Sequence, residues 1–178
     1  MSLRKNITSI ILISIGIFIP VISKYDNYKN NYQEQININN YLNNRKSPYL
    51  MILDIPKIKL NKGIYDLNSR ENNISKNIEL LNYSNLDTNT IVLASHSGTA
   101  SNAYFNNVPN LSINDKIYIY YNHKKYTYII NDIYYIDKTG FLEIDNNIDN
   151  TLILITCSLL YNNKQIIVSS TLNNIEII

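Results

Sequence analysis

TLILIT at residues 151–156 and KQIIVSSTL at residues 164–172 are two apolar runs, rich in β-branched residues, with a short link between them that contains the polar letters YNN. Runs of this composition that are bounded by polar turns are typical of β-strands. A short polar link between two such runs favours a tight hairpin. The C-terminal part of the chain is therefore expected to form a pair of adjacent antiparallel strands.

Four further runs of the same kind precede this pair. They are MILDIPKI at 51–58, TIVLAS at 90–95, KIYIYY at 116–121 and KKYTYIINDIYYI at 124–136. Helical spacing of apolar residues is brief, near 74–81 and 105–111, and the second stretch contains Pro109. Several short strands with turn residues between them predict a mainly β fold, a small closed or nearly closed β-barrel with one or two short helices.

The composition of the 178-residue chain fits one ordinary domain with appendages. Its 16 Lys and Arg against 14 Asp and Glu leave a net charge of +2, which is too weak for electrostatic capture of nucleic acid. A single cysteine excludes an intrachain disulfide and a Cys-rich zinc or iron–sulfur site. We expect neither a cofactor nor a metal site.

Residues 7–23, ITSIILISIGIFIPVIS, form an uncharged apolar run. Its length lies between that of a signal-peptide core and that of a spanning helix. The residues before Lys24 show no A-x-A cleavage pattern, which favours an uncleaved transmembrane helix over a cleaved signal peptide. Because Arg4 and Lys5 precede the run, the positive-inside tendency places residues 1–6 in the cytoplasm and the chain after the run outside.

The next stretch, residues 24–46, is polar with little apolar periodicity. Such a stretch is expected to be a tether, because it cannot bury enough surface to fold. The folded domain is expected over residues 47–178. Together these expectations describe a single-pass protein of the cell membrane with an extracytoplasmic β-domain.

Cys157 directly follows the run TLILIT and precedes a turn. A strand end fixes the backbone and leaves the side chain near the surface, as a thiol nucleophile requires. Outside the membrane, an unpaired cysteine indicates a reactive role or an intermolecular bond. The alternative is that Cys157 is a small buried apolar residue.

His96 follows the run TIVLAS and also stands at a strand exit. Imidazole can take up and return a proton near neutral pH, which is what a cysteine nucleophile needs from its partner. The other histidine, His123, lies in the polar turn YNHKKY and is expected to be a solvated hairpin residue. His96 is therefore the candidate partner of Cys157, although a histidine in this setting can also be purely structural.

Three segments share the order and spacing of one enzyme family. ILITC at 153–157 is similar to a TLxTC nucleophile motif, with Ile153 in place of the first Thr. LASHSGTASNAYFNNV at 93–108 is similar to the family's histidine segment, with Ser95 where Gly is common, and IPKIKLNKGIYD at 55–66 is similar to its first strand. In these features the chain resembles the sortases, the Gram-positive enzymes that join surface proteins to the cell envelope.

The resemblance implies a sortase-like β-barrel in which Cys157 is the nucleophile of a transpeptidase and His96 is its acid–base partner. It implies a surface-protein substrate with an LPxTG-like C-terminal signal, and an amine acceptor from peptidoglycan or a pilin. The family places an Arg early in the strand after the cysteine, and the matching residue in this chain is Lys164. Lysine can bring positive charge to an oxyanion but lacks the planar fork of arginine. The short interval between His96 and Cys157 is closer to the class A or D pattern than to class B.

Three other hypotheses stay open at this point. Within the family, the chain could be a pilin polymerase or a specialised sorting enzyme rather than a housekeeping one. A catalytically inactive, membrane-tethered β-barrel that binds envelope polymer or protein would keep Cys157 and His96 as core residues. Some sortases bind calcium just before the nucleophile strand, where this chain has Glu143, Asp145 and Asp149. A solvated loop is expected there instead, because carboxylates in polar loops seldom form a cage.

Overall fold

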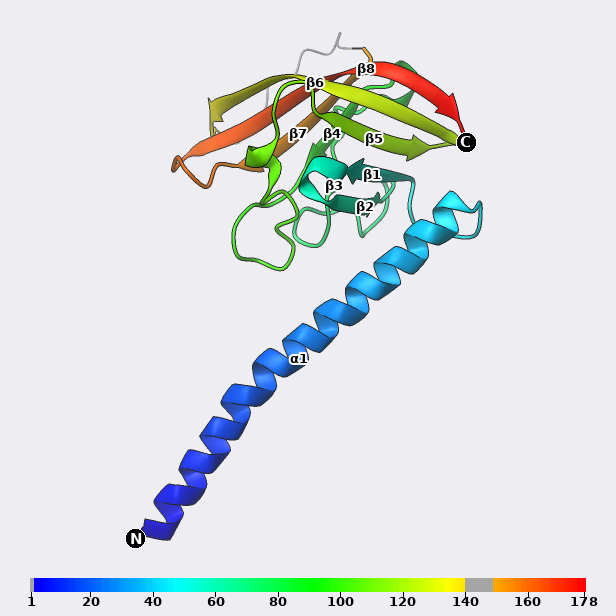
Figure 1. The fold of residues 1–178 in the computed structure, drawn as a ribbon. Helices are drawn as coiled ribbons and strands as arrows, with labels where there is room; N and C mark the ends of the chain where they lie inside the picture. The colour runs from blue at the N-terminus through cyan, green and yellow to red at the C-terminus, as the bar shows by residue number, and fades with distance from the viewer. Residues whose placement is uncertain (1, 140–148) are drawn as a thin grey trace.

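The computed structural model describes residues 2–139 and 149–178, and it consists of one long helix followed by a single eight-stranded sheet (Figure 1). The helix is α1 (Ser2–Leu42). The strands are β1 (Met51–Ile55), β2 (Leu60–Ile64), β3 (Glu79–Leu80), β4 (Ile91–Ala94), β5 (Lys116–Tyr121), β6 (Lys124–Asp137), β7 (Thr151–Cys157) and β8 (Lys164–Ile177). Three 3-10 helices lie between them, η1 (Pro56–Ile58), η2 (Leu86–Thr88) and η3 (Val108–Asn110).

The strand order across the sheet is β2-β1-β5-β6-β8-β7-β4-β3. Neighbouring strands run antiparallel, apart from β4 and β7, which are parallel. Leu53 of β1, Leu80 of β3 and Leu154 of β7 belong to one buried cluster, although their strands are distant in the order. The sheet therefore curls around a common core into a nearly closed barrel, which confirms the predicted mainly β fold.

The six predicted strands are all present, and two further strands were not predicted. β2 has the sequence LNKGI, whose polar residues and glycine hide its strand character, yet it pairs with β1 along all five residues. β3 has two residues, too few for a pattern. The predicted hairpin is also present, because β7 pairs antiparallel with β8 from Cys157 and Gln165 onward. Its link at 158–163 has six residues and is longer than the tight turn that was expected.

The link between β5 and β6 is a two-residue turn made by Asn122 and His123. Their φ values are 49° and 58°, and positive φ at both central residues is the mark of a type I′ hairpin turn. Both side chains are exposed. The prediction that His123 is a solvated hairpin residue is confirmed.

The barrel wall formed by β4, β7 and β8 is buried on both faces. Even-numbered Leu152 and Leu154 of β7 belong to the main core, whereas odd-numbered Ile153 and Ile155 point to the opposite face. There they form a second cluster, whose other buried members are Val92, Ala94 and Ile167, with Ile74, Leu81 and Ile136 packed against it. Continued to the strand ends, this alternation shows to which face of the sheet each terminal side chain points.

Helix α1 differs from the unfolded tether expected over residues 24–46, because the helix continues to Leu42. Ile38 is buried against Tyr49 and against Ile52, on the outer side of β1. Glu34 accepts a hydrogen bond from the Gly63 N–H at 2.9 Å, and its carboxylate forms an ion pair of 3.1 Å with Lys62. Packing on the barrel thus supplies the apolar burial that the segment lacks alone.

Only a narrow face of α1 packs on the barrel. Glu34, Ile38 and Tyr41 follow helical spacing on one face of α1, and the Tyr41 hydroxyl donates to the Leu50 carbonyl oxygen at 2.9 Å. The N-terminal end of α1 extends away from the barrel, whereas its C-terminal end lies beside it (Figure 1). Within the part of the chain that the structure describes, no helix combines the length and the apolar character needed to cross a membrane.

Candidate active site

The parallel pair β4 and β7 sets the position of His96 and Cys157. Ala94 of β4 is paired with Ile155 of β7, and the Ser95 N–H extends the ladder by donating to the Ile155 carbonyl oxygen at 3.2 Å. His96 and Cys157 each lie two residues beyond the Ala94–Ile155 pair. Because side chains alternate along a strand, both residues are expected on the face of Ala94 and Ile155, about 5 Å apart in backbone spacing.

Two side-chain hydrogen bonds join the strand exits at this point. The buried Thr156 hydroxyl donates to the Ser95 carbonyl oxygen at 2.9 Å. The Ser97 hydroxyl donates to the Cys157 carbonyl oxygen at 2.6 Å. Each bond reaches from one chain segment to the other on either side of His96 and Cys157. The two exits are therefore held in register where the ladder ends.

The segment after His96 is a closed loop with its own bonds. The Phe105 N–H donates to the His96 carbonyl oxygen at 3.1 Å, and the Phe105 ring is fully buried in the main core. Asn106 bonds to both polar groups of the Gly98 backbone, accepting from its N–H at 2.5 Å and donating to its carbonyl oxygen at 2.8 Å. Gly98 has φ of 123°, which a side chain would disfavour. These contacts fix the path of the backbone from His96 onward.

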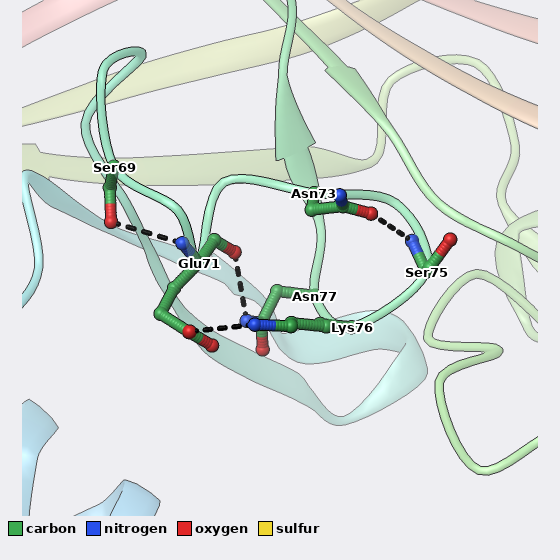
Figure 2. A network of polar contacts seen from close by, with 6 residues as sticks. All are labelled: Ser69, Glu71, Asn73, Ser75, Lys76 and Asn77. Carbon is green, nitrogen blue, oxygen red and sulfur yellow. Dashed lines mark hydrogen bonds and ion pairs between the residues drawn. The ribbon is translucent and has the colours of Figure 1, made fainter.

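The loop between β2 and β3 supports the His96 loop from outside. Figure 2 shows its polar network, in which the Glu71 carboxylate forms an ion pair of 2.8 Å with Lys76. The backbone carbonyl oxygen of Glu71 accepts a hydrogen bond from the Asn77 side chain at 2.9 Å. Within the same network Ser69 accepts from the Glu71 N–H and Asn73 accepts from the Ser75 N–H.

Two residues of the His96 loop bond to this network. Asn102 donates to the Ser75 carbonyl oxygen at 2.9 Å, and the Tyr104 hydroxyl donates to the Lys76 carbonyl oxygen at 3.2 Å. Burial, together with the nearby Glu34 carboxylate, raises the pKa of Tyr104, so its hydroxyl remains a hydrogen-bond donor well above neutral pH. The two loops therefore form one hydrogen-bonded layer beside the strand exits.

Lys164, the third predicted residue, begins β8. Its ammonium forms an ion pair of 2.8 Å with Asp137, where the Lys164 side chain is 40% exposed and the Asp137 side chain 74% exposed. Cys157 is paired across the hairpin with the next residue, Gln165. The structure thus brings Cys157 and His96 to one edge, whereas Lys164 is adjacent in sequence to the residue opposite Cys157.

Gln165, Ser97 and Thr156 were not among the predicted site residues, although all three lie at this edge. The position of Gln165 opposite Cys157 is set by the register of the β7–β8 hairpin. That register depends on the link after Cys157. The residues Glu143 and Asp145, considered for calcium, lie outside the described residues, and Asp149 precedes β7.

An apolar rim follows Cys157 in the link to β8. Leu159, Leu160 and Tyr161 are exposed there, and Leu160 retains 74% of its exposure. The Tyr161 ring meets the Tyr135 ring edge-on, with centroids 5.3 Å apart and planes at 87°. Strand exits that bring a half-buried cysteine and a half-buried histidine to one edge, with exposed apolar residues following the cysteine, are suited to attack on an extended peptide.

Comparisons with known proteins identify the family and the fold. The family model described as the Sortase domain matches residues 53–173. No curated protein matches the chain. Among solved structures, Listeria monocytogenes sortase A is similar with a TM-score of 0.62, at 20% identity over 74% of this chain and 92% of that chain.

Two further structures have a TM-score of 0.59. Sortase A from Corynebacterium diphtheriae, a lid mutant, is 25% identical over 71% of each chain. Sortase C-1 from Actinomyces oris is 24% identical over 72% of this chain and 76% of that chain. The domain match spans most of the barrel and includes His96 and Cys157. The chain belongs to the sortase family of cysteine transpeptidases.

Proposed function

We propose that the chain cleaves an LPxTG-like sorting signal through a thioester at Cys157 and transfers the surface protein to an amine of peptidoglycan or of a pilin. The observation that supports this most is the in-register exit of β4 and β7, which directs His96 and Cys157 to the same edge. A nucleophile and its acid–base partner must lie within reach of one carbonyl group. Substrate and acceptor are inferred from the family; a Streptococcus pneumoniae sortase C structure is described in terms of pilin substrate specificity.

In the first half-reaction, the Cys157 thiolate attacks the Thr carbonyl carbon, and the electron pair of the C=O double bond moves to oxygen. The C–N bond to Gly then breaks as the carbonyl reforms, and the His96 imidazolium gives its proton to the departing amine. In the second half-reaction, an incoming amine attacks the thioester and loses a proton to His96. The thiolate leaves, so the enzyme returns to its starting state.

Lys164 stays a prediction as the source of positive charge for the oxyanion. An ion pair with the exposed Asp137 would not prevent this role by itself, because surface pairs contribute about 0–1 kcal/mol. On this hypothesis Lys164→Ala lowers turnover severely, and Lys164→Arg preserves a substantial part because the charge is retained. A harmless Lys164→Ala would mean that another group serves the oxyanion.

The proposed topology places residues 1–6 in the cytoplasm, an anchor at 7–23, and the barrel domain of residues 47–178 outside the cell. The support comes from the uncharged apolar run and from Arg4 and Lys5 before it. Residues 24–46 connect anchor and barrel, and their helical part contacts β2. A protease-protection experiment on cells expressing the full chain tests this arrangement. Cleavage of the barrel from outside supports the topology, and full protection contradicts it.

The catalytic proposal is tested with the full chain in detergent micelles and a set of fluorogenic Leu-Pro-Xaa-Thr-Gly peptides. We expect cleavage, a thioester adduct on Cys157 by mass spectrometry, and transfer to added triglycine. Cys157→Ala should abolish all three, and equal activity in this variant would contradict the mechanism. If no peptide is cleaved and Cys157 resists alkylation until the protein is denatured, the chain is a binding module instead.

A further inference from the structure

The residue directly across the β7–β8 hairpin from Cys157 is Gln165. Ile155 is paired with Ile167, two residues further from the strand ends, and both belong to the outer cluster. Ile166, between Gln165 and Ile167, belongs to the main core instead. Strand alternation therefore puts Gln165 on the face of Cys157 and puts Lys164 on the other face.

We propose that Gln165 donates a hydrogen bond to the scissile carbonyl oxygen and stabilises the oxyanion, the role for which Lys164 was predicted. This inference rests on the proposed function, because it names the oxyanion donor of that same site. Side chains of directly opposed residues have Cβ atoms about 4.5–5.5 Å apart. A carbonyl carbon bound to the Cys157 sulfur thus lies within the length of a glutamine side chain.

The surroundings of Gln165 leave its amide available. The residue is half-buried, and within residues 2–139 and 149–178 its side chain has no hydrogen-bond partner. Its neighbour in β6 is Ile136, an apolar residue packed against the outer cluster. Lys164 has a partner instead, the Asp137 carboxylate at 2.8 Å on the neighbouring strand.

The chemistry suits a neutral donor. When the S–C bond forms, the carbonyl oxygen takes up the electron pair of its double bond, and a primary amide offers two N–H groups to that oxygen. Gln165 forms no covalent bond and gives up no proton. Its N–H donates to the oxygen until the carbonyl reforms and the C–N bond breaks, with the proton for the departing amine coming from His96.

The placement of Gln165 can be tested without any peptide. The full chain in detergent is alkylated with iodoacetate, which is anionic, and separately with iodoacetamide, which is neutral. The iodoacetate rate divided by the iodoacetamide rate reports the charge near the Cys157 thiol. Gln165→Lys should raise this ratio about tenfold and Gln165→Glu should lower it about tenfold, by attraction or repulsion at close range. Lys164→Met should leave it within about twofold, because the ammonium lies on the other face.

The matched control is Ser169→Glu, which puts a carboxylate on the same strand and face but opposite Ile153 rather than Cys157. Its ratio should stay close to that of the unmodified chain. The placement is overturned if Lys164→Met lowers the ratio about tenfold, or if both charges at residue 165 leave it unchanged while thermal unfolding shows a folded protein.

The donor role is tested by turnover of the cleaved Leu-Pro-Xaa-Thr-Gly peptide. Gln165→Ala should lower kcat about 100-fold or more, the usual effect of losing an oxyanion donor, with KM and the iodoacetamide rate changed less than about threefold. Gln165→Glu, which has the same shape without the N–H groups, should be no better, and Gln165→Arg should recover part of kcat. Retention of half the kcat in Gln165→Ala overturns the inference.

The two levels of failure remain separate. If the unmodified chain forms no thioester with any peptide, the proposed function fails and the donor role falls with it, while the alkylation ratios still decide where Gln165 lies. If the unmodified chain turns over and Gln165→Ala does too, the proposed function stands and this inference alone is wrong.

Discussion

His96 and His123 offer a controlled comparison at the scale of single residues, because they are the two histidines of the chain. We expect His96→Ala to lower kcat for peptide cleavage about 100-fold or more, as loss of an acid–base group does. His123 has φ of 58°, so its control is His123→Asn, which tolerates that conformation. This variant should keep full turnover, and a similar loss in both variants would remove His96 from the mechanism.

Thr156 carries a second prediction at this scale. Its buried hydroxyl donates to the Ser95 carbonyl oxygen, so Thr156→Val keeps the shape and leaves a buried acceptor without its donor. We expect a loss of about 1–2 kcal/mol in the free energy of unfolding, measured by urea denaturation. Thr156→Ser retains the hydroxyl and should recover part of that loss. A valine variant as stable as the unmodified chain would show that the bond contributes nothing.

The positions of Cys157 and His96 at strand exits were predictable because each follows an apolar run that is visible in the sequence. The position of Gln165 was not visible in the same way. A shift of one residue in the pairing of β8 moves every side chain to the other face, and this decides between Lys164 and Gln165. The register depends on the conformation of the six-residue link at 158–163, which sequence patterns do not determine.

At the scale of elements, the β1–β2 pair contains a polar contact that responds to pH. Asp54 is paired with Asn61, whose side-chain oxygen is buried without a hydrogen-bond partner among the described residues. Burial raises the pKa of Asp54, although the Asn61 side chain and the Lys125 charge oppose the shift. The folded state therefore holds the Asp54 proton more tightly than the unfolded state.

The stability that Asp54 contributes is thus fully present below its unfolded pKa of 3.8, and it is lost as the pH rises through the raised folded pKa. We expect Asp54→Asn to raise the free energy of unfolding at pH 7 by about 1 kcal/mol, since an amide can also donate to Asn61. The gain should shrink as the pH falls from 7 to 4 in urea denaturation. Asp132→Asn, an exposed change in β6, is the control, and a pH-independent gain at residue 54 would contradict this explanation.

Strands rich in β-branched or aromatic residues, such as β5 and β7, were predictable from composition alone. β2 and β3 were not, because their stability comes from pairing with β1 and β4 and not from their own side chains. Helix α1 was missed beyond residue 24 for a related reason. Ile38 is the one fully buried apolar residue described in this part of the helix. One apolar residue in several turns produces no helical periodicity of hydrophobic residues that the sequence could reveal.

At the scale of the whole molecule, the contact between α1 and the barrel joins two parts of the chain. We expect Ile38→Ala to lower the free energy of unfolding by about 2 kcal/mol, because it leaves a cavity between Tyr49 and Ile52. Backbone amides at 39–44 should then exchange hydrogen faster, measured by mass spectrometry. Ile36→Ala, two residues away and only half-buried, is the control. Equal exchange in the two variants would show that Ile38 does not hold the helix.

The helical form of residues 24–42 has a consequence for how far the enzyme can reach. A flexible tether would allow many distances between the barrel and the anchor. A helix rises 1.5 Å per residue, so these 19 residues span a fixed length of about 28 Å. In the proposed topology, the thiol then operates at one height above the bilayer. A sorting signal would have to present its scissile bond at that height, so the spacing between signal and membrane would act as a ruler for substrate choice.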